Sequence, residues 1–231
     1  IRYLMRERHG SPFEHNSMTF FVQAPIFVWR EHMRHRIASY NEESGRYREL
    51  RPIFYVPDQT RSVVQDGKPG AYEFHPGTPE QYAVIDSATR ESCVVAYDAY
   101  QRMLDAGIAR EVARMVLPVT IYSSAYVTMN ARSLMNFLSL RKKSDDATYP
   151  SYPQREIEMV AEAYEDHFAR LMPITHEAFV ASGRVQSWRE CPLRVRSRPA
   201  SEASTAARSW LRTTVASYSS RSGAASERAG W

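Results

Sequence analysis

The stretch RHRIASYNEESGRY, residues 34–47, is the most distinctive part of the 231-residue chain. It holds three arginines and no lysine, together with a histidine, two glutamates, two serines and an asparagine. Arginine presents a rigid fork of N–H donors that matches phosphate oxygens and carbonyl edges two at a time. Because Glu42 and Glu43 lie inside the cationic run, it is not a plain nucleic-acid patch. We interpret the stretch as a site for a phosphorylated ligand, with carboxylates available for ribose hydroxyls or for orienting the arginines.

The residues before this stretch predict a strand and a helix that lead into it. Residues 17–24 are rich in β-branched and aromatic side chains, which is typical of a strand. Pro25 then begins a helix, since proline is tolerated at the first helical position. We expect this helix to end near residues 37–40 and residues 39–47 to follow as a loop. Its buried face is expected to be supplied mostly by Ile26, Phe27, Trp29, Met33 and Ile37.

The remainder of the chain predicts several helices and one further strand. Thr78, Pro79 and Gln81 form a capping box with proline at N1, which opens a helix to about Asp105 with Gly107 as its C-cap. Its apolar face is expected to hold Val84, Ile85, Ala88, Val95, Tyr100, Met103 and Leu104. Beyond it we expect a helix over 109–117, a strand over 119–128, and helices over 130–141 and 154–171. Pro173 is expected to end the last of these, and residues 175–177 to cap a short final helix that runs to about Ser182. Residues 66–70 are expected to form a turn.

Length and composition fit one large domain, or one domain and a tail. The chain is 43% hydrophobic, yet no apolar run approaches the roughly 20 residues that a membrane span needs, so we expect no membrane partner. No signal peptide is expected at Ile1. Two cysteines, Cys93 and Cys191, suit a reducing compartment, and we expect a cytoplasmic location. Neither lies near the arginine stretch in sequence, so no cysteine nucleophile is expected, and we expect no metal site.

The net charge of +4 is unevenly distributed along the chain. Residues 184–231 hold nine arginines, no lysine and three glutamates, a charge of +6, which leaves −2 for the rest (4 minus 6). We therefore expect a catalytic domain over 1–183 and a basic tail rich in Ser, Ala and Arg over 184–231. Few apolar residues recur in the tail at any period, which predicts disorder. There are two alternatives: a basic tail that associates with RNA or a membrane, and a non-native extension. Because the positive charge lies in the tail and not in the expected domain, it is not evidence for nucleic-acid binding, and we expect no nucleic-acid partner.

Residues 34–47 also resemble the signature R-H-R-x-x-S-x-N-E-x-S-x-R-Y of flavin-dependent thymidylate synthases, with every fixed position present. Residues 9–15 resemble the family's H-x-[TS]-x-x-E-H segment. Residues 114–118 and 130–141 also closely resemble segments of this family. The resemblance implies an α+β fold in which a small, mostly antiparallel sheet packs with several long helices. It also implies an upstream strand and helix, so we expect this sequence to be a fragment.

The family transfers a methylene group from methylenetetrahydrofolate to C5 of dUMP and reduces it with hydride that comes from NADPH through FAD. The resemblance therefore implies an FAD-dependent methyltransferase of nucleotide biosynthesis, working as a homotetramer with shared active sites. Two rival interpretations remain: a flavin- or nucleotide-binding homologue without synthase activity, and a basic RNA-binding module favoured only by the tail.

The resemblance also assigns site residues. The implied catalytic residues are Arg141 and Ser44. Arg141 would bond the pyrimidine edge, and Ser44 would contact the ligand rather than act as a nucleophile, since a serine without a nearby base is a weak nucleophile. Residues implied to bind dUMP are Arg34, Glu42, Glu43, Ser44, Gly45, Arg46, Arg114 and Arg141. Residues implied to contact FAD or folate are His9, Ser11, Glu14, Arg34, His35, Arg36, Ile37, Asn130, Arg132, Asn136 and Leu140.

The sequence departs from the family pattern after Arg141. A histidine that touches the flavin usually follows four residues later, and here that position is Asp145. Residues 142–153 also form a segment a few residues longer than usual, with two prolines. We therefore expect flavin affinity or the geometry of this loop to differ from the family pattern.

Overall fold

A computed structural model describes residues 1–69 and 71–185, and the expected tail beyond residue 185 lies outside the described residues. The helices and strands are α1 (Arg2–Arg6), η1 (Ser11–Phe13), β1 (Met18–Pro25), α2 (Ile26–His32), β2 (Ser39–Glu42), β3 (Val64–Lys68), β4 (Ala71–His75), α3 (Pro79–Asp105), α4 (Arg110–Ala113), η2 (Arg114–Val116), β5 (Tyr122–Met129), α5 (Ala131–Arg141), α6 (Arg155–Leu171) and α7 (Pro173–Ala181). Within the described residues, no helix has both the length and the apolar character of a membrane span.

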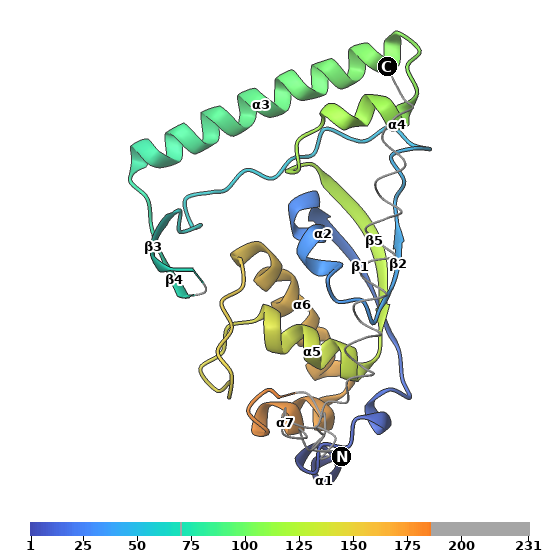
Figure 1. The fold of residues 1–231 in the computed structure, drawn as a ribbon, viewed down its shortest axis with the longest axis vertical. Helices are drawn as coiled ribbons and strands as arrows, with labels where there is room; N and C mark the ends of the chain where they lie inside the picture. The colour runs from blue at the N-terminus through green and yellow to red at the C-terminus, as the bar shows by residue number, and fades with distance from the viewer. Residues whose placement is uncertain (70, 186–231) are drawn as a thin grey trace, which may run out of the picture. The chain divides into compact units, whose positions relative to one another are not determined.

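The sheet that organises the site has three strands in the order β1-β5-β2, with both pairs antiparallel (Figure 1). In β1, buried and exposed residues alternate over most of the strand, so Phe20 and Val22 face the core while Phe21 faces outward. This alternation follows from the two-residue period of a strand. The predicted strand over 17–24 and the predicted antiparallel sheet are confirmed. In a separate hairpin, β3–β4, Lys68 pairs with Ala71, so residues 66–68 of the predicted turn belong to strand β3 instead.

The core lies where α2, α5 and α6 pack against one another and against the sheet. On α5, Leu134, Phe137 and Leu138 are completely buried, at the spacing that places side chains on one helix face. Each fully buried side chain of this size stabilises the fold by about 1.5–3 kcal/mol. The predicted helices over 130–141 and 154–171 are confirmed to within one residue, and the short final helix begins two residues before its predicted cap, at Pro173.

The segment that holds the arginine stretch differs from our prediction. The helix ends at His32, not near residues 37–40, and Ser39–Glu42 forms β2 where we expected a loop. Ile37 is 78% exposed and Met33 is also exposed, so the expectation that both supply a buried face is wrong. The reason is tertiary: the backbone of β2 pairs with β5, which lies far along the chain and leaves no local signal.

The predicted boundaries of the long helix α3 are confirmed, but its predicted apolar face is only partly buried. Both hydrogen bonds of the capping box at Thr78 are present, and Gly107, just past the helix, has a φ of +77°. Tyr100 is fully buried, but Val84 and Val95 are 65% and 62% exposed. The predicted helix over 109–117 is shorter, because α4 ends at Ala113 and continues as the 3₁₀ turn η2.

The α3 cap gives a stability prediction. We expect Thr78→Ala to lower the free energy of unfolding by about 1 kcal/mol, because it removes the side-chain oxygen that accepts the Gln81 N–H. Urea unfolding followed by circular dichroism would measure the change. Ser87→Ala, at an exposed position inside the same helix, should change stability much less; an equal loss in both variants would contradict the capping role.

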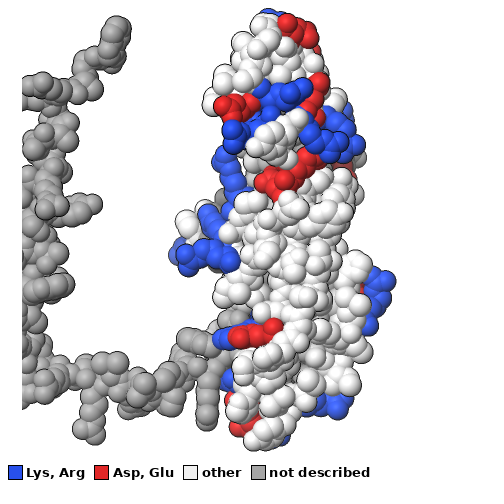
Figure 2. All heavy atoms as spheres, turned by 90° about the vertical axis from the view of Figure 1, so that its right-hand side faces the viewer, with Lys and Arg blue, Asp and Glu red and all other residues white. Residues whose placement is uncertain are grey.

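Figure 2 shows one face of the molecule, on which charged side chains are unevenly placed. Lys, Arg, Asp and Glu crowd the end that carries α3 and α4, and a broad uncharged area covers the middle. Several large apolar side chains of the described residues are exposed, among them Phe21 and Tyr126, which pair across β1 and β5 with ring centroids 5.2 Å apart. Exposed apolar surface of this kind is typical of a protein–protein contact.

Candidate active site

Arg141, the last residue of α5, is held by two side chains from the segment around α2. Its Nε donates to His35 Nε2 at 3.0 Å, and its Nη1 donates to Glu31 Oε2 at 3.1 Å. Among the described residues we find no partner for Nη2. The guanidinium is therefore fixed on one side and free to bind a ligand through the other.

A buried histidine lies beneath this cluster. His32 Nε2 is 2.9 Å from the Tyr164 hydroxyl, and His32 Nδ1 is 3.2 Å from the Tyr40 hydroxyl. The Tyr40 hydroxyl can also donate to the backbone carbonyls of His32 and His35. The Phe137 ring packs against both imidazoles, with centroids 4.8 Å from His32 and 4.6 Å from His35. These contacts tie the turn after α2 to α5, α6 and β2.

Both histidines are neutral at physiological pH. Burial, followed by charge repulsion from His35 and Arg141, lowers the pKa of His32 to about 4. Burial, followed by the positive charge of Arg141, lowers the pKa of His35 to about 4. The neutral state of His35 agrees with its hydrogen bond, since only an unprotonated Nε2 can accept from Arg141.

This pair predicts a fall in stability in mild acid. Between pH 6.5 and about 4, the unfolded histidines bind protons that the folded ones do not, so the free energy of unfolding falls as the pH falls. For the fully buried His32, the loss between pH 7 and pH 4 is about 3 kcal/mol. Urea unfolding at several pH values would measure it. A His32→Phe variant should show a shallower fall, and a wild-type stability that stays flat from pH 7 to pH 5 would contradict the prediction.

A second cluster of predicted residues surrounds Gly45. The Arg46 Nε donates to Glu111 Oε2 at 2.8 Å, and a Cβ added at Gly45 would lie 3.1 Å from Leu50 and 3.4 Å from Arg114. The backbone at Gly45 thus lies close to the side chains of Leu50 and Arg114. Arg114 is exposed beside it, so the guanidinium groups of Arg46 and Arg114 belong to the same surface region.

The two glutamates of the arginine stretch are engaged within the chain. Glu42 Oε1 accepts the Ser123 hydroxyl at 2.5 Å, and Glu43 forms an ion pair with Arg48 at 3.1 Å. The Ser44 hydroxyl accepts the Arg46 N–H at 3.3 Å. Within the described residues, no side-chain base is hydrogen-bonded to the Ser44 hydroxyl.

A third cluster joins the N-terminal segment to the start of α5. Glu14 and Arg132 form an ion pair, and Asn16 Oδ1 accepts the Ala131 N–H at 2.8 Å. Asn130 caps α5, since its Oδ1 accepts the Ser133 N–H at 2.9 Å. The remaining predicted residues of this part, which are partly or fully exposed, are His9, Ser11, Asn136 and Leu140.

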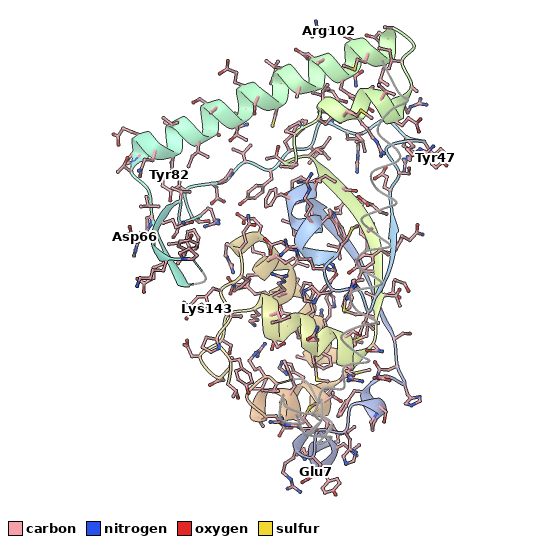
Figure 3. The ribbon with its side chains drawn as sticks, viewed as in Figure 1. Glu7, Tyr47, Asp66, Tyr82, Arg102 and Lys143 are labelled. Carbon is pink, nitrogen blue, oxygen red and sulfur yellow. The ribbon has the colours of Figure 1, made fainter. Side chains whose placement is uncertain are left out.

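One chain does not gather the three clusters into a pocket. Tyr47, at the end of the arginine stretch, and Lys143, just past α5, lie on opposite sides of β5 in Figure 3. Among the described residues, a cavity of about 470 Å³ lies between β1 and α6, and none of the predicted site residues lines it. Glu43 alone of those residues lines a smaller hollow of about 170 Å³.

Two carboxylates that the sequence interpretation missed hold the key arginines. Glu31 pairs with Arg141, and Glu111 pairs with Arg46. The partners are 110 and 65 residues apart, so no spacing in the sequence connects them. Glu111, on α4, lies three residues before Arg114, the first residue of η2, which is the one local sign of its position.

The side chains available around these clusters suit a flavin dinucleotide. The exposed guanidinium groups of Arg34 and Arg36 can bind a pyrophosphate, and the side-chain amides of Asn130 and Asn136 can bind ring or ribose oxygens. Ile37, 78% exposed directly after Arg36, offers an apolar surface for a planar ring. The donor set therefore fits FAD.

The comparisons with known proteins agree with this chemistry. A family model described as thymidylate synthase complementing protein matches residues 1–174. A flavin-dependent thymidylate synthase from Streptomyces coelicolor is 66% identical over 186 residues, which cover 80% of this chain and 76% of the relative. One from Tropheryma whipplei is 60% identical over 185 residues, covering 80% and 77%. The chain belongs to the flavin-dependent thymidylate synthase family.

Solved structures show that this family member has the expected fold. A crystal structure described as a UMP/dUMP methylase, PolB from Streptomyces cacaoi bound with 5-Br UMP, is 60% identical, with a TM-score of 0.79 over 80% of this chain and 83% of that chain. The same methylase bound with 5-Br dUMP gives a TM-score of 0.76. The α+β fold implied by the flavin-dependent thymidylate synthase signature is confirmed.

Proposed function

We propose that this chain is a flavin-dependent thymidylate synthase, which methylates dUMP to dTMP with methylenetetrahydrofolate as carbon donor and NADPH as reductant. The single observation that carries the proposal is the arrangement of Arg141. His35 and Glu31 fix its Nε and Nη1, and Nη2 is left for a ligand. This arrangement occurs beside a complete family signature, in a chain 66% identical to a synthase of that name.

Arginines would hold the substrate at both ends. We assign the dUMP phosphate to Arg34, Ser44, Arg46 and Arg114, with backbone N–H groups of the Gly45 turn as further donors. Arg141 would bond the pyrimidine edge and stabilise the negative charge that builds up on the ring when C5 becomes nucleophilic. Cys93 on α3 is buried, with its Sγ 3.5 Å from the Thr120 hydroxyl, and takes no part in this assignment.

FAD would supply the hydride that reduces the transferred methylene group, after reduction by NADPH. The chain's own residues would bind and orient it. Arg34 and Arg36 would hold its pyrophosphate, and Asn130, Arg132 and Asn136 would contact it from the start of α5. The same cofactor would also contact His9, Ser11 and Glu14. The ion pair between Glu14 and Arg132 links this N-terminal segment to the start of α5.

We further propose that the active site is shared between chains of a homotetramer. The support is that the predicted residues form separate clusters within one chain, while apolar side chains on the sheet and on α3 are exposed. Size-exclusion chromatography coupled to an activity assay tests this. An active monomer would refute it. A cytoplasmic location is proposed because the two cysteines suit a reducing compartment.

Tritium release from 5-tritiated dUMP tests the synthase proposal, because methylation at C5 must expel the hydrogen there. The purified chain should be yellow and should release tritium only when NADPH and methylenetetrahydrofolate are both present. Flavin absorbance without tritium release would favour the rival, a flavin- or nucleotide-binding homologue without synthase activity. Anaerobic bleaching of the flavin by NADPH, with and without dUMP, would then locate the missing step.

The similarity to PolB favours one second candidate activity, methylation of UMP. That protein is described as a UMP/dUMP methylase and is 60% identical to this chain. Parallel assays with 5-tritiated UMP and 5-tritiated dUMP would decide. We expect the greater rate with dUMP, and a greater rate with UMP would reverse the assignment of the preferred substrate.

A further inference from the structure

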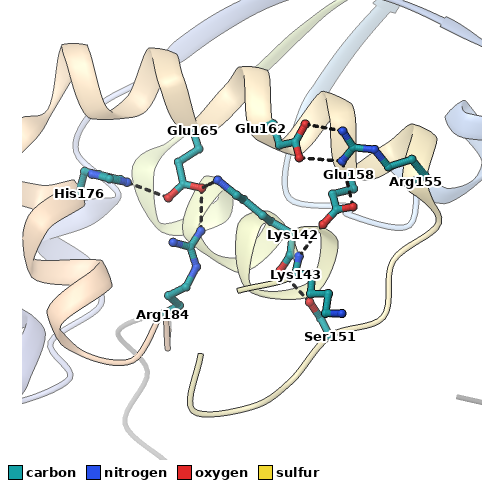
Figure 4. Close-up of polar contacts among 9 residues, drawn as sticks. All are labelled: Lys142, Lys143, Ser151, Arg155, Glu158, Glu162, Glu165, His176 and Arg184. Atoms are coloured by element: carbon teal, nitrogen blue, oxygen red, sulfur yellow. Dashed lines mark hydrogen bonds and ion pairs between the residues drawn. The ribbon is translucent and has the colours of Figure 1, made fainter. Parts of the chain in front are cut away.

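Three basic side chains converge on one buried carboxylate close to the end of α5 (Figure 4). Glu165 on α6 accepts Lys142 Nζ at 2.6 Å, Arg184 Nη2 at 2.7 Å and His176 Nε2 at 2.8 Å. The Glu165 side chain is only 7% exposed. Because the donors come from the residue after α5, from α7 and from the chain beyond α7, this carboxylate joins three segments to α6.

The Glu165 carboxylate is ionised over the whole working pH range. Burial by itself raises its pKa, but the hydrogen bonds from Arg184, Lys142 and His176 outweigh burial and lower the pKa to about 2. A buried charge persists only when it is paired and hydrogen-bonded, so the three donors and the carboxylate depend on one another. Removing the negative charge would leave the ammonium group of Lys142 partly buried without its partner.

Lys142 has every one of its polar groups engaged. Its Nζ binds Glu165, its carbonyl accepts the Ser151 hydroxyl at 2.7 Å, and its N–H donates to the Leu138 carbonyl at 3.1 Å. It ends α5 with an extended backbone, φ −126° and ψ 127°. Its neighbour in sequence, Arg141, extends to a different partner set, His35 and Glu31. The peptide bond that joins them is therefore held by contacts of both residues.

The loop after Lys142 is attached to the same helix. The Lys143 N–H donates to Glu158 Oε1 at 3.0 Å, and Arg155 pairs with Glu158 and Glu162 at 3.0 and 2.7 Å. Further along, the Thr148 N–H donates to the Gly183 carbonyl at 2.9 Å. This is the loop that we expect to be longer than the family pattern, with Asp145 where the resemblance implies a histidine.

We propose that Glu165 is a positioning residue for Arg141: by anchoring Lys142 it keeps the last turn of α5 formed and the free side of the Arg141 guanidinium aimed at the pyrimidine. The final residues of a helix lack intrahelical partners for their carbonyls and fray unless something holds them. The inference rests on the proposed function, because it takes the pyrimidine of dUMP as the ligand of Arg141.

The test compares two ligands that differ only in the pyrimidine. Calorimetry on the full chain would measure the affinity for dUMP and for 2-deoxyribose 5-phosphate in wild type, Glu165→Gln and Glu162→Gln. Glutamine keeps the shape of the side chain and removes its charge. We expect Glu165→Gln to weaken dUMP binding about tenfold, because small displacements of a positioned group are costly, and to leave the sugar phosphate nearly unaffected. Glu162→Gln, on the same helix but with a side chain 41% exposed and no contact to Lys142, should match wild type.

The outcomes separate positioning from general loosening. Equal weakening of both ligands, or a dUMP affinity equal to wild type, would overturn the proposal. If Glu165→Gln does not fold, Lys142→Met tests the same link, because Glu165 then keeps Arg184 and His176, and the same selective loss is expected. If the wild-type chain binds dUMP but releases no tritium, the proposed synthase activity is wrong. The positioning proposal would still be tested, because the affinity comparison depends on how Arg141 binds the pyrimidine and not on turnover.

Discussion

Replacing Arg141 by alanine is expected to lower tritium release from 5-tritiated dUMP by about a hundred- to a thousandfold, the scale of losing one donor to a developing negative charge. Arg141 is the one arginine of the predicted set whose guanidinium is held on one side by two protein partners and open on the other. A ligand that binds there gains its hydrogen bonds without first ordering the side chain, so the loss should fall on turnover as well as on affinity.

Two further variants make the Arg141 experiment decisive. Arg141→Lys keeps the charge but loses the planar fork, so we expect it to restore little activity. Arg170→Ala removes an exposed arginine near the end of α6, whose hydrogen bonds within the described residues go only to His167 and the Asp166 carbonyl, and it should turn over like wild type. Turnover close to wild type in Arg141→Ala would show that the pyrimidine assignment is wrong.

The largest stability effect is expected from Phe137→Ala, with a loss of about 3–5 kcal/mol in the free energy of unfolding. Phe137 is fully buried and its ring contacts three others, those of His32, His35 and Tyr164. Alanine would leave a cavity between the two neutral histidines and free the His35 ring from the position in which it accepts from Arg141. Urea unfolding at pH 7 measures the loss.

Phe21→Ala is the matched control for this substitution. Phe21 is 57% exposed on β1 and makes a cross-strand pair with Tyr126, so its removal should cost less than about 1 kcal/mol. A comparable loss in both variants would mean that the exposed sheet face is as well packed in solution as the core. The expected difference between the two variants therefore also reports on whether a partner chain covers β1.

Sequence patterns predicted the elements whose signals are local. The capping box at Thr78, the glycine after α3 and the apolar spacing of α5 and α6 depend on residues within one or two turns of each other, and all are present. Failures came where partners are distant. The pairing of β2 with β5 replaced a predicted loop, and the exposure of Val84 and Val95 on α3 reflects what surrounds the helix, not its own pattern.

The candidate site shows the same division. Its residue types were evident, because arginine, serine and asparagine in this order form a family signature. The contacts among them were not. Glu31 beside Arg141, Glu111 beside Arg46, and Glu165 with its three basic partners all join segments separated along the chain, so that only the folded structure shows them together.

By itself, the sequence determined the chemistry of this protein: which residues can bind phosphate, which helices form, and to which family the signature belongs. Those properties follow from side-chain types and from short-range periodicity. Only the tertiary structure decided which carboxylates hold which arginines, which histidines lose their charge and where the arginine stretch leaves its helix. Burial and pairing set these properties, and both depend on atoms brought together from distant parts of the chain.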